Sequence, residues 1–183
     1  MFAGADGDDF DEVRHLLESM VDRVLYCGGV GKGQVTKLIN NLVTEVMTVV
    51  VGEALALGVR SGASIDLLRS ALHEGTAQTR LLDEMLPMTV FRGDWRPGFR
   101  LDLAEKDLGL AVELAQEQGM TLTAIDEVVG LYRQAMAKGW SSLSSHTVVR
   151  LIEEAARVEL RSPIFQGLAP RPEAPRSAAE EEE

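Results

Sequence analysis

Two side chains that could take part in proton chemistry lie one helical turn apart in the most apolar part of the sequence. Lys37 and Asn41 are four residues apart, so a helix through this region places both on one face. A lysine that is partly removed from water is suited to passing a proton to or from a hydroxyl. The alternative is an ordinary lysine that extends its ammonium to solvent from the first turn of the helix. The spacing alone leaves both interpretations open.

A second lysine, Lys106, lies in a segment whose apolar residues recur at helical spacing between positions 101 and 111. This pattern predicts an amphipathic helix. It favours a solvated, charged face for Lys106 and its neighbour Asp107. By itself, the periodicity therefore gives Lys106 no functional role.

A glycine-rich loop, residues 28–33, precedes the apolar region and includes Gly31 and Gly33. The dinucleotide-binding pattern G-x-G-x-x-G fails, because Gln34 or Thr36 stands where its third glycine is required. The phosphate-binding P-loop also fails, because Gln34 follows Gly33 in place of the Lys-Ser/Thr pair. On these residues alone, a turn between two domains is the favoured interpretation.

Helices must position these side chains, because almost the whole chain has helical periodicity. Residues 34–60 form one predicted helix of roughly 40 Å that is apolar on more than one face, which is typical of a central helix with several partners. Short strands are predicted over residues 1–4 and 23–27, with a helix between them that begins at Asp8 and Asp9. Further helices are predicted over residues 65–72, 81–87, 101–118, 123–138 and 147–158.

Composition narrows the class of protein. The formal net charge of −11 disfavours nucleic acids and anionic membrane surfaces as partners, because both require basic side chains. The single cysteine, Cys27, excludes an internal disulfide, and the three histidines have no metal-ligand spacing. Asn40 and Glu53 interrupt the apolar region, so we expect a buried helix and no membrane span. With no signal peptide at the N-terminus, we expect a cytoplasmic location.

Read together, the lysine segments resemble a known family. Residues 31–41 resemble the G-x-G-x-x-x-K-x-x-N-N signature of the β-hydroxyacid dehydrogenases, the 3-hydroxyisobutyrate dehydrogenase family. Residues 106–111 resemble the K-D-L-x-L-A motif of that family, and Tyr132 and Gly139 also fall at suitable positions. The resemblance implies a mainly α fold, a helical bundle around one long central helix, with a small α/β remnant of a Rossmann domain at the N-terminus. The expected parts are this remnant over residues 1–30, the all-helical domain over 31–160 and a disordered tail over 161–183.

The resemblance also implies roles for individual residues. Lys37 would be the catalytic group that exchanges a proton with the substrate oxygen, and Asn41 would orient the substrate beside it. Lys106 would lie near the cofactor or the substrate carboxylate. Gly31 and Gly33 would let the backbone pass close to cofactor and substrate. The implied cofactor is NAD or NADP, and the implied substrate is a small 3-hydroxy acid or its semialdehyde.

Several departures from the family qualify these expectations. The opening G-x-G-x-x-G strand and the Ser-Gly-Gly loop of the family are missing, so we expect a fragment that is inactive alone. Ser144 stands where the family tends to have aspartate. The alternative function is a non-catalytic helical relic that binds a partner or itself. In either case the apolar central helix predicts a homodimer or higher homo-oligomer.

Overall fold

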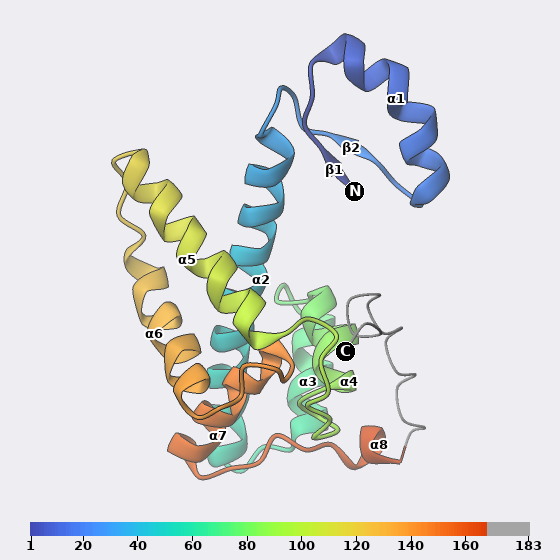
Figure 1. Cartoon of the computed structure of the whole chain (residues 1–183). Coiled ribbons are helices and arrows are strands. Elements are labelled where there is room, and N and C mark those ends of the chain that lie inside the picture. The colour runs from blue at the N-terminus through green and yellow to red at the C-terminus, as the bar shows by residue number, and fades with distance from the viewer. Residues whose placement is uncertain (168–183) are drawn as a thin grey trace, which may run out of the picture.

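The computed structural model describes residues 1–167, and helices account for most of them (Figure 1). The elements in chain order are β1 (Phe2–Ala3), α1 (Gly7–Met20), β2 (Leu25–Tyr26), α2 (Lys32–Arg60), α3 (Ile65–Glu74), the π-helical turn η1 (Leu81–Met85), α4 (Leu86–Met88), α5 (Leu101–Glu117), α6 (Thr123–Ala137), the 3-10 turn η2 (Ser145–Val148), α7 (Val149–Ala156) and α8 (Pro163–Gln166). The predicted fold class, a helical bundle around one long helix with a small α/β unit at the N-terminus, is confirmed.

Helix α2 runs through the middle of the bundle and contacts α3, α5, α6 and α7. Gly52 makes the close crossing of α7 possible, because a Cβ atom there would lie 3.1 Å from Ile152 Cδ1. By length and composition α2 is apolar enough to cross a membrane. Leu42, Val49 and Leu55 belong instead to the buried core that α2 shares with the surrounding helices. The central position of α2 thus explains part of its hydrophobicity, whereas Val43, Val50 and Leu57 remain exposed.

The α/β unit at the N-terminus extends from the first turn of α2 (Figure 1). Strands β1 and β2 pair in parallel, with Phe2 opposite Leu25, and α1 crosses between them. The ring of Phe10 on α1 stacks on that of Tyr26 on β2, with 4.5 Å between centroids. The N-cap position of α1 is Asp6, whereas Asp8 and Asp9 lie within its first turn and favour the helix dipole.

Gly33 joins this unit to α2 because the backbone of β1 passes directly over it. A Cβ atom at Gly33 would lie 2.9 Å from the backbone nitrogen of Gly4 and 2.9 Å from the carbonyl oxygen of Phe2. We therefore expect Gly33→Ala to displace β1 and to lower the free energy of unfolding by about 1–3 kcal/mol, the usual cost of overpacking. Urea unfolding measures this loss. Gly109→Ala is the control, because a Cβ atom there meets nothing within 4 Å. Equal stability of the two variants would refute the close approach.

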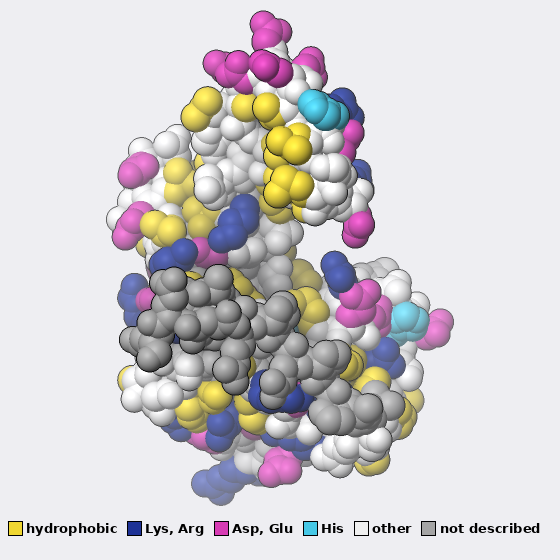
Figure 2. All heavy atoms as spheres, turned by 45° about the vertical axis from the view of Figure 1, so that its right-hand side comes forward, with side chains coloured by type: hydrophobic (Ala, Val, Ile, Leu, Met, Phe, Trp, Pro, Cys, Tyr) yellow, Lys and Arg dark blue, Asp and Glu magenta, His cyan; other side chains and the backbone are white. Residues whose placement is uncertain are grey.

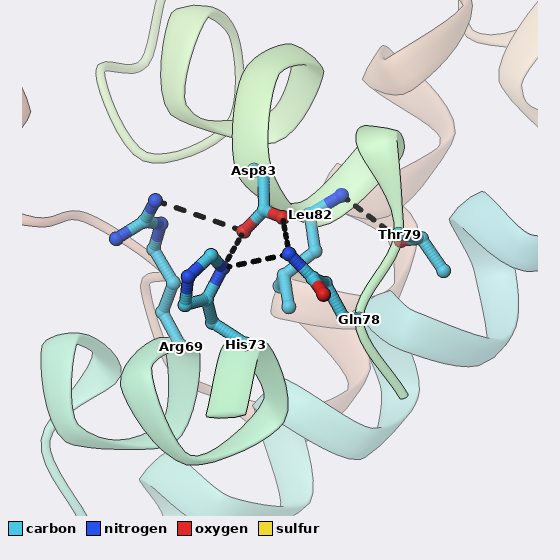
Figure 3. A network of polar contacts seen from close by, with 6 residues as sticks. All are labelled: Arg69, His73, Gln78, Thr79, Leu82 and Asp83. Atoms are coloured by element: carbon cyan, nitrogen blue, oxygen red, sulfur yellow. Dashed lines mark hydrogen bonds and ion pairs between the residues drawn. The ribbon is translucent and has the colours of Figure 1, made fainter. Parts of the chain in front are cut away.

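The turn that follows α3 is fixed by a polar network (Figure 3). Asp83 accepts a hydrogen bond from Gln78, lies 2.8 Å from His73 Nδ1, and is 3.8 Å from the Arg69 guanidinium. Thr79 caps the start of η1 by accepting from the backbone N–H of Leu82. The helix predicted to stop at Pro87 ends one residue later, at Met88, as the short helix α4 that follows η1. Proline is tolerated there because it occupies the first turn of a new helix, where no N–H is needed.

The disordered tail predicted from residue 161 is not found over residues 161–167. Ser162 is fully buried, its backbone N–H donates to the carbonyl of Phe91, and its hydroxyl donates to Asp66. Arg161 is anchored by Glu153 on α7. These contacts join segments distant in the sequence, so composition could not predict them. The rest of the predicted tail, residues 168–183, lies outside the described residues.

Candidate functional site

Lys37 and Asn41 of α2 meet at one carboxylate of α5. The ammonium of Lys37 donates to Oδ2 of Asp107 over 2.8 Å, and the amide nitrogen of Asn41 donates to the same oxygen over 2.6 Å. The side chain of Asp107 is 4% exposed, whereas that of Lys37 is 45% exposed. The buried carboxylate therefore holds both donor groups in place and leaves part of the Lys37 side chain in contact with solvent.

Asp107 is a candidate functional residue that the sequence pattern did not reveal. It lies on the buried face of α5 with Ala104, Leu108 and Ala111, so the prediction of a solvated face is wrong for this residue. The signal was present in the periodicity, because position 107 falls three residues after Ala104 and four before Ala111. An unpaired carboxylate at such a position is costly, which implies partners on a facing element.

Lys106 is held beside the same carboxylate, with its ammonium 3.3 Å from Oδ1 of Asp107 and a side chain that is 57% exposed. The structure thus brings Lys37, Asn41 and Lys106 together around Asp107. Two ammonium groups share one carboxylate, so the cluster carries a net positive charge and favours an anionic ligand. Among residues 1–167 no group of histidine, cysteine and acidic side chains could hold a metal ion.

Hydrogen bonding sets the protonation state of Asp107. Desolvation by burial acts to raise the pKa of this carboxyl, but the hydrogen bonds from Lys37, Asn41 and Lys106 outweigh it and lower the pKa below its ordinary value. Asp107 therefore remains ionised at neutral pH, which keeps its donors in place.

The lowered pKa of Asp107 predicts a loss of stability in acid. A group whose pKa is lower in the folded chain contributes its full stability above the unfolded-state value of about 3.9, and that contribution disappears as the pH falls through the folded-state value. We expect the wild-type chain to exceed Asp107→Asn in Tm by roughly 3 °C at pH 6 and to lose that advantage below pH 4. Calorimetry from pH 3 to 6 measures it. Parallel curves for the two proteins would contradict the assignment.

The glycine loop and Lys37 line one pocket. Its volume is about 380 Å³, and its walls come from β1 and the start of α2: Phe2, Gly4, Gly31, Gly33, Gln34 and Lys37. Gly31 has φ of 84°, a left-handed conformation that favours glycine, and it precedes the first residue of α2. Gly31 and Gly33 thus lie with Lys37, as expected of residues near one ligand, whereas Lys106 is outside this lining.

A buried acid on α2, Glu45, continues the row begun by Lys37 and Asn41. Each of the three follows the previous one by four residues, so they lie on one face of the helix. This polar row in an apolar helix is the sequence signal that could have revealed Glu45. Desolvation raises the pKa of Glu45 to about 7, although hydrogen bonds from Tyr132 and Ser145 oppose the shift. At neutral pH this carboxyl is therefore close to half protonated.

Ser144, which stands where the family tends to have aspartate, is buried and brings no acid to the cluster. Its backbone N–H donates to the carbonyl of Trp95 over 3.0 Å, and Ser144 forms an isolated antiparallel bridge with Arg100. The serine thereby helps to fasten the loop before α5 against the turn that leads into η2. The acidic groups near Lys37 and Asn41 are Asp107 and Glu45.

Comparison with known proteins places this fold and cluster in a class. The family model described as NAD-binding of NADP-dependent 3-hydroxyisobutyrate dehydrogenase matches residues 31–152, which run from the glycine loop to the middle of α7. The mitochondrial 3-hydroxyisobutyrate dehydrogenase of Mus musculus is 31% identical over 153 residues, or 80% of this chain and 46% of the relative. The 2-hydroxy-3-oxopropionate reductase of Escherichia coli is 29% identical over 160 residues, or 87% of this chain and 54% of the relative.

A solved structure agrees with the sequence matches. The 3-hydroxyisobutyrate dehydrogenase of Mycobacterium tuberculosis, in a structure with L-serine, superposes with a TM-score of 0.75 at 26% identity and covers 81% of this chain and 53% of its own. The chain therefore belongs to the 3-hydroxyisobutyrate dehydrogenase family of β-hydroxyacid dehydrogenases, through the helical C-terminal domain of that family. It spans about half the length of the curated relatives it matches.

Proposed function

We propose that this chain supplies the substrate-binding and proton-handling domain of an NAD(P)-dependent β-hydroxyacid dehydrogenase, which interconverts a small 3-hydroxy acid and its semialdehyde. One observation carries the proposal: the Lys37 ammonium is held 2.8 Å from a buried carboxylate, beside Asn41 and at the wall of a glycine-lined pocket. This arrangement presents a fixed proton donor to a ligand. The relative solved with L-serine is consistent with a small hydroxy acid as the substrate.

In the proposed reaction the residues of this chain handle the proton. In the oxidation direction Lys37 acts as the neutral amine, accepts the hydroxyl proton and becomes the ammonium; in the reduction direction the ammonium hydrogen-bonds the substrate oxygen and donates that proton to it. Asn41 orients the substrate, and Asp107 keeps both donors aimed at it. Lys106 adds positive charge for a carboxylate or a phosphate. NAD(P), when bound, supplies the hydride acceptor or donor.

The residues at the glycine pocket fit such a cofactor. Gly31 has nothing within 4 Å of the position where a Cβ atom would stand, so the backbone there is open to a flat ring. The neighbouring α/β unit leaves Leu16 and Met20 of α1 exposed, and Figure 2 shows apolar side chains gathered on it. We propose that further elements of a cofactor domain cover this surface, because an isolated two-stranded sheet is marginal in water.

The test joins the chain to the cofactor domain of a relative and follows NAD(P) reduction with 3-hydroxyisobutyrate and related hydroxy acids. Turnover that depends on Lys37 is the expected result. Absence of turnover in a folded, cofactor-binding fusion would sink the proposal.

A second candidate, a helical module that associates with itself, is favoured by one feature of α2. Val43, Val50 and Leu57 recur every seven residues and are 50%, 54% and 69% exposed. Such a row fits the same row on a second copy, as in a coiled coil. A chain that self-associates through this row but never supports turnover in the fusion would favour this candidate over the dehydrogenase.

A further inference from the structure

A second pocket opens on the other side of Asn41 from the glycine loop. Its volume is about 390 Å³, and its lining includes Asn41, Glu45, Arg80, Met85, Phe99 and Ser145, drawn from α2, the η1 region, the loop before α5 and η2. A volume of this size falls within the range of small-ligand sites. We call it the Glu45 pocket.

Asn41 connects this pocket to the Lys37 cluster. Its amide nitrogen donates to Asp107, while the residue also forms part of the pocket wall. Glu45 follows Asn41 by one helical turn, a rise of about 5.4 to 6 Å. A ligand that contacts Asn41 can therefore place an arm of several bonds next to Glu45.

The polar end of the pocket is built by buried side chains. Glu45 is 3% exposed, Ser145 is 2% exposed and Tyr132 is fully buried behind them. The Tyr132 hydroxyl donates to Oε2 of Glu45, and Ser145 is also hydrogen-bonded to this carboxyl. A carboxylate offers about four acceptor positions, so these two donors leave capacity for a third.

The surroundings of Glu45 set which third donor it accepts. The charged or ionisable groups around it are Asp107 on α5, Tyr132 on α6 and Arg80 at the pocket edge. Arg80 is engaged by Glu84 over 2.6 Å. The charge of Asp107 is balanced by Lys37 and Lys106, so the Glu45 carboxylate is the group that repels an anionic arm in this pocket and attracts a donor. Met85 and Phe99 supply apolar wall for the carbon chain of that arm.

We infer that the Glu45 pocket receives the side arm of the substrate and selects arms that end in a hydrogen-bond donor, an ammonium or a hydroxyl, over arms that end in a methyl or a carboxylate. Glu45 is then a specificity-determining residue, with Tyr132 and Ser145 holding its carboxyl in place. The identity of the ligand as a substrate rests on the proposed function, whereas the preference of the pocket can be measured on this chain by itself.

The probes are n-butylammonium, n-butanol and butyrate, which share one carbon chain and differ at its end. Each is titrated into the full chain at pH 8, where a carboxyl with a pKa of about 7 is mostly ionised. Amide chemical shifts of Asn41, Glu45 and Ser145 report the pocket. We expect saturable shifts with n-butylammonium and n-butanol and no saturation with butyrate. Binding of butyrate as tight as that of n-butylammonium would overturn the inference.

The variant Glu45→Gln keeps the shape and removes the charge. We expect n-butylammonium to bind it about tenfold more weakly, because a hydrogen bond to a charged acceptor is replaced by a neutral one. Glu53→Gln removes one negative charge from an exposed position of the same helix, so it controls for attraction by net charge. Equal loss in both variants would overturn the inference. If Glu45→Gln does not fold, the comparison of the three probes on the wild-type chain still decides it.

The two proposals fail separately. If the pocket prefers donors but the fusion shows no turnover, the dehydrogenase proposal is refuted and the inference about the pocket stands. If the fusion turns over hydroxy acids but the chain shows no preference among the probes, the inference about the pocket is refuted and the dehydrogenase proposal stands.

Discussion

Lys37→Ala is expected to lower turnover of the chain joined to a cofactor domain by about 10²–10⁴-fold, the usual contribution of a positioned proton donor. The side chain that the mutation removes is the one that Asp107 orients, and its ammonium is half exposed at the pocket wall. Steady-state rates of NAD(P) reduction measure the loss. Affinity for the cofactor should change less than turnover, because the proposed role of Lys37 is to exchange a proton with the substrate oxygen.

Lys138→Ala is the matched control for that result. Lys138 lies just beyond the end of α6 and pairs with Glu154 at the surface, remote from α5 in the sequence and outside the pocket at Lys37. It should leave turnover unchanged within about twofold, because an exposed ion pair contributes about 0–1 kcal/mol to stability and nothing to proton transfer. If Lys37→Ala retains the wild-type rate in a folded fusion, Lys37 is not the proton donor.

Glu153→Ala is expected to cause the largest loss of stability, about 3 kcal/mol, with a fall in Tm of roughly 10 °C. The buried Glu153 carboxylate accepts from Arg161 over 2.7 and 3.2 Å and from the backbone N–H of Leu160 over 2.7 Å. Its removal leaves a mostly buried guanidinium without its counter-charge and a buried N–H without an acceptor. Urea unfolding and calorimetry measure the effect.

The neighbouring residue Glu154 provides the control for this prediction. Its carboxylate pairs with Lys138 in the open, where both side chains are more than 40% exposed. Glu154→Ala should therefore cost no more than about 1 kcal/mol. If the two alanine variants unfold at the same urea concentration, Glu153 does not anchor the segment after α7.

Local pattern was sufficient to predict most of the fold. Runs of apolar residues at helical spacing predicted α2, α5 and α6 with ends accurate to a few residues. Ser64 caps α3 by accepting from the N–H of Leu67, a contact that spans only three residues. Gly119 has φ of 68° just after α5, the left-handed conformation with which a glycine commonly ends a helix. These features depend on residues within one or two helical turns, so they can be predicted directly from the local sequence.

The candidate site was predictable only in part. The four-residue spacing of Lys37 and Asn41 places them on one face in any helix, and the family signature pointed to the same two residues. The roles of Asp107 and Glu45 were missed because their partners come from other elements. Glu45 meets Tyr132, 87 residues later in the chain, and Asp107 meets Asn41 across 66 residues.

The sequence by itself therefore determined the long helices, which of them is central, and that Lys37 and Asn41 lie on one face of it, whereas it did not predict the short helix α8. Only the tertiary structure decided that α5 crosses α2 with Asp107 next to Lys37, that Arg161 pairs with Glu153, and that Ser162 is buried against Phe91 and Asp66. The physical reason is the distance along the chain over which each effect acts. Periodicity and capping act over a few residues, whereas the partner of a buried charge depends on where distant helices cross. A charged residue at an inward position shows that a partner must exist, and the packing determines which one it is.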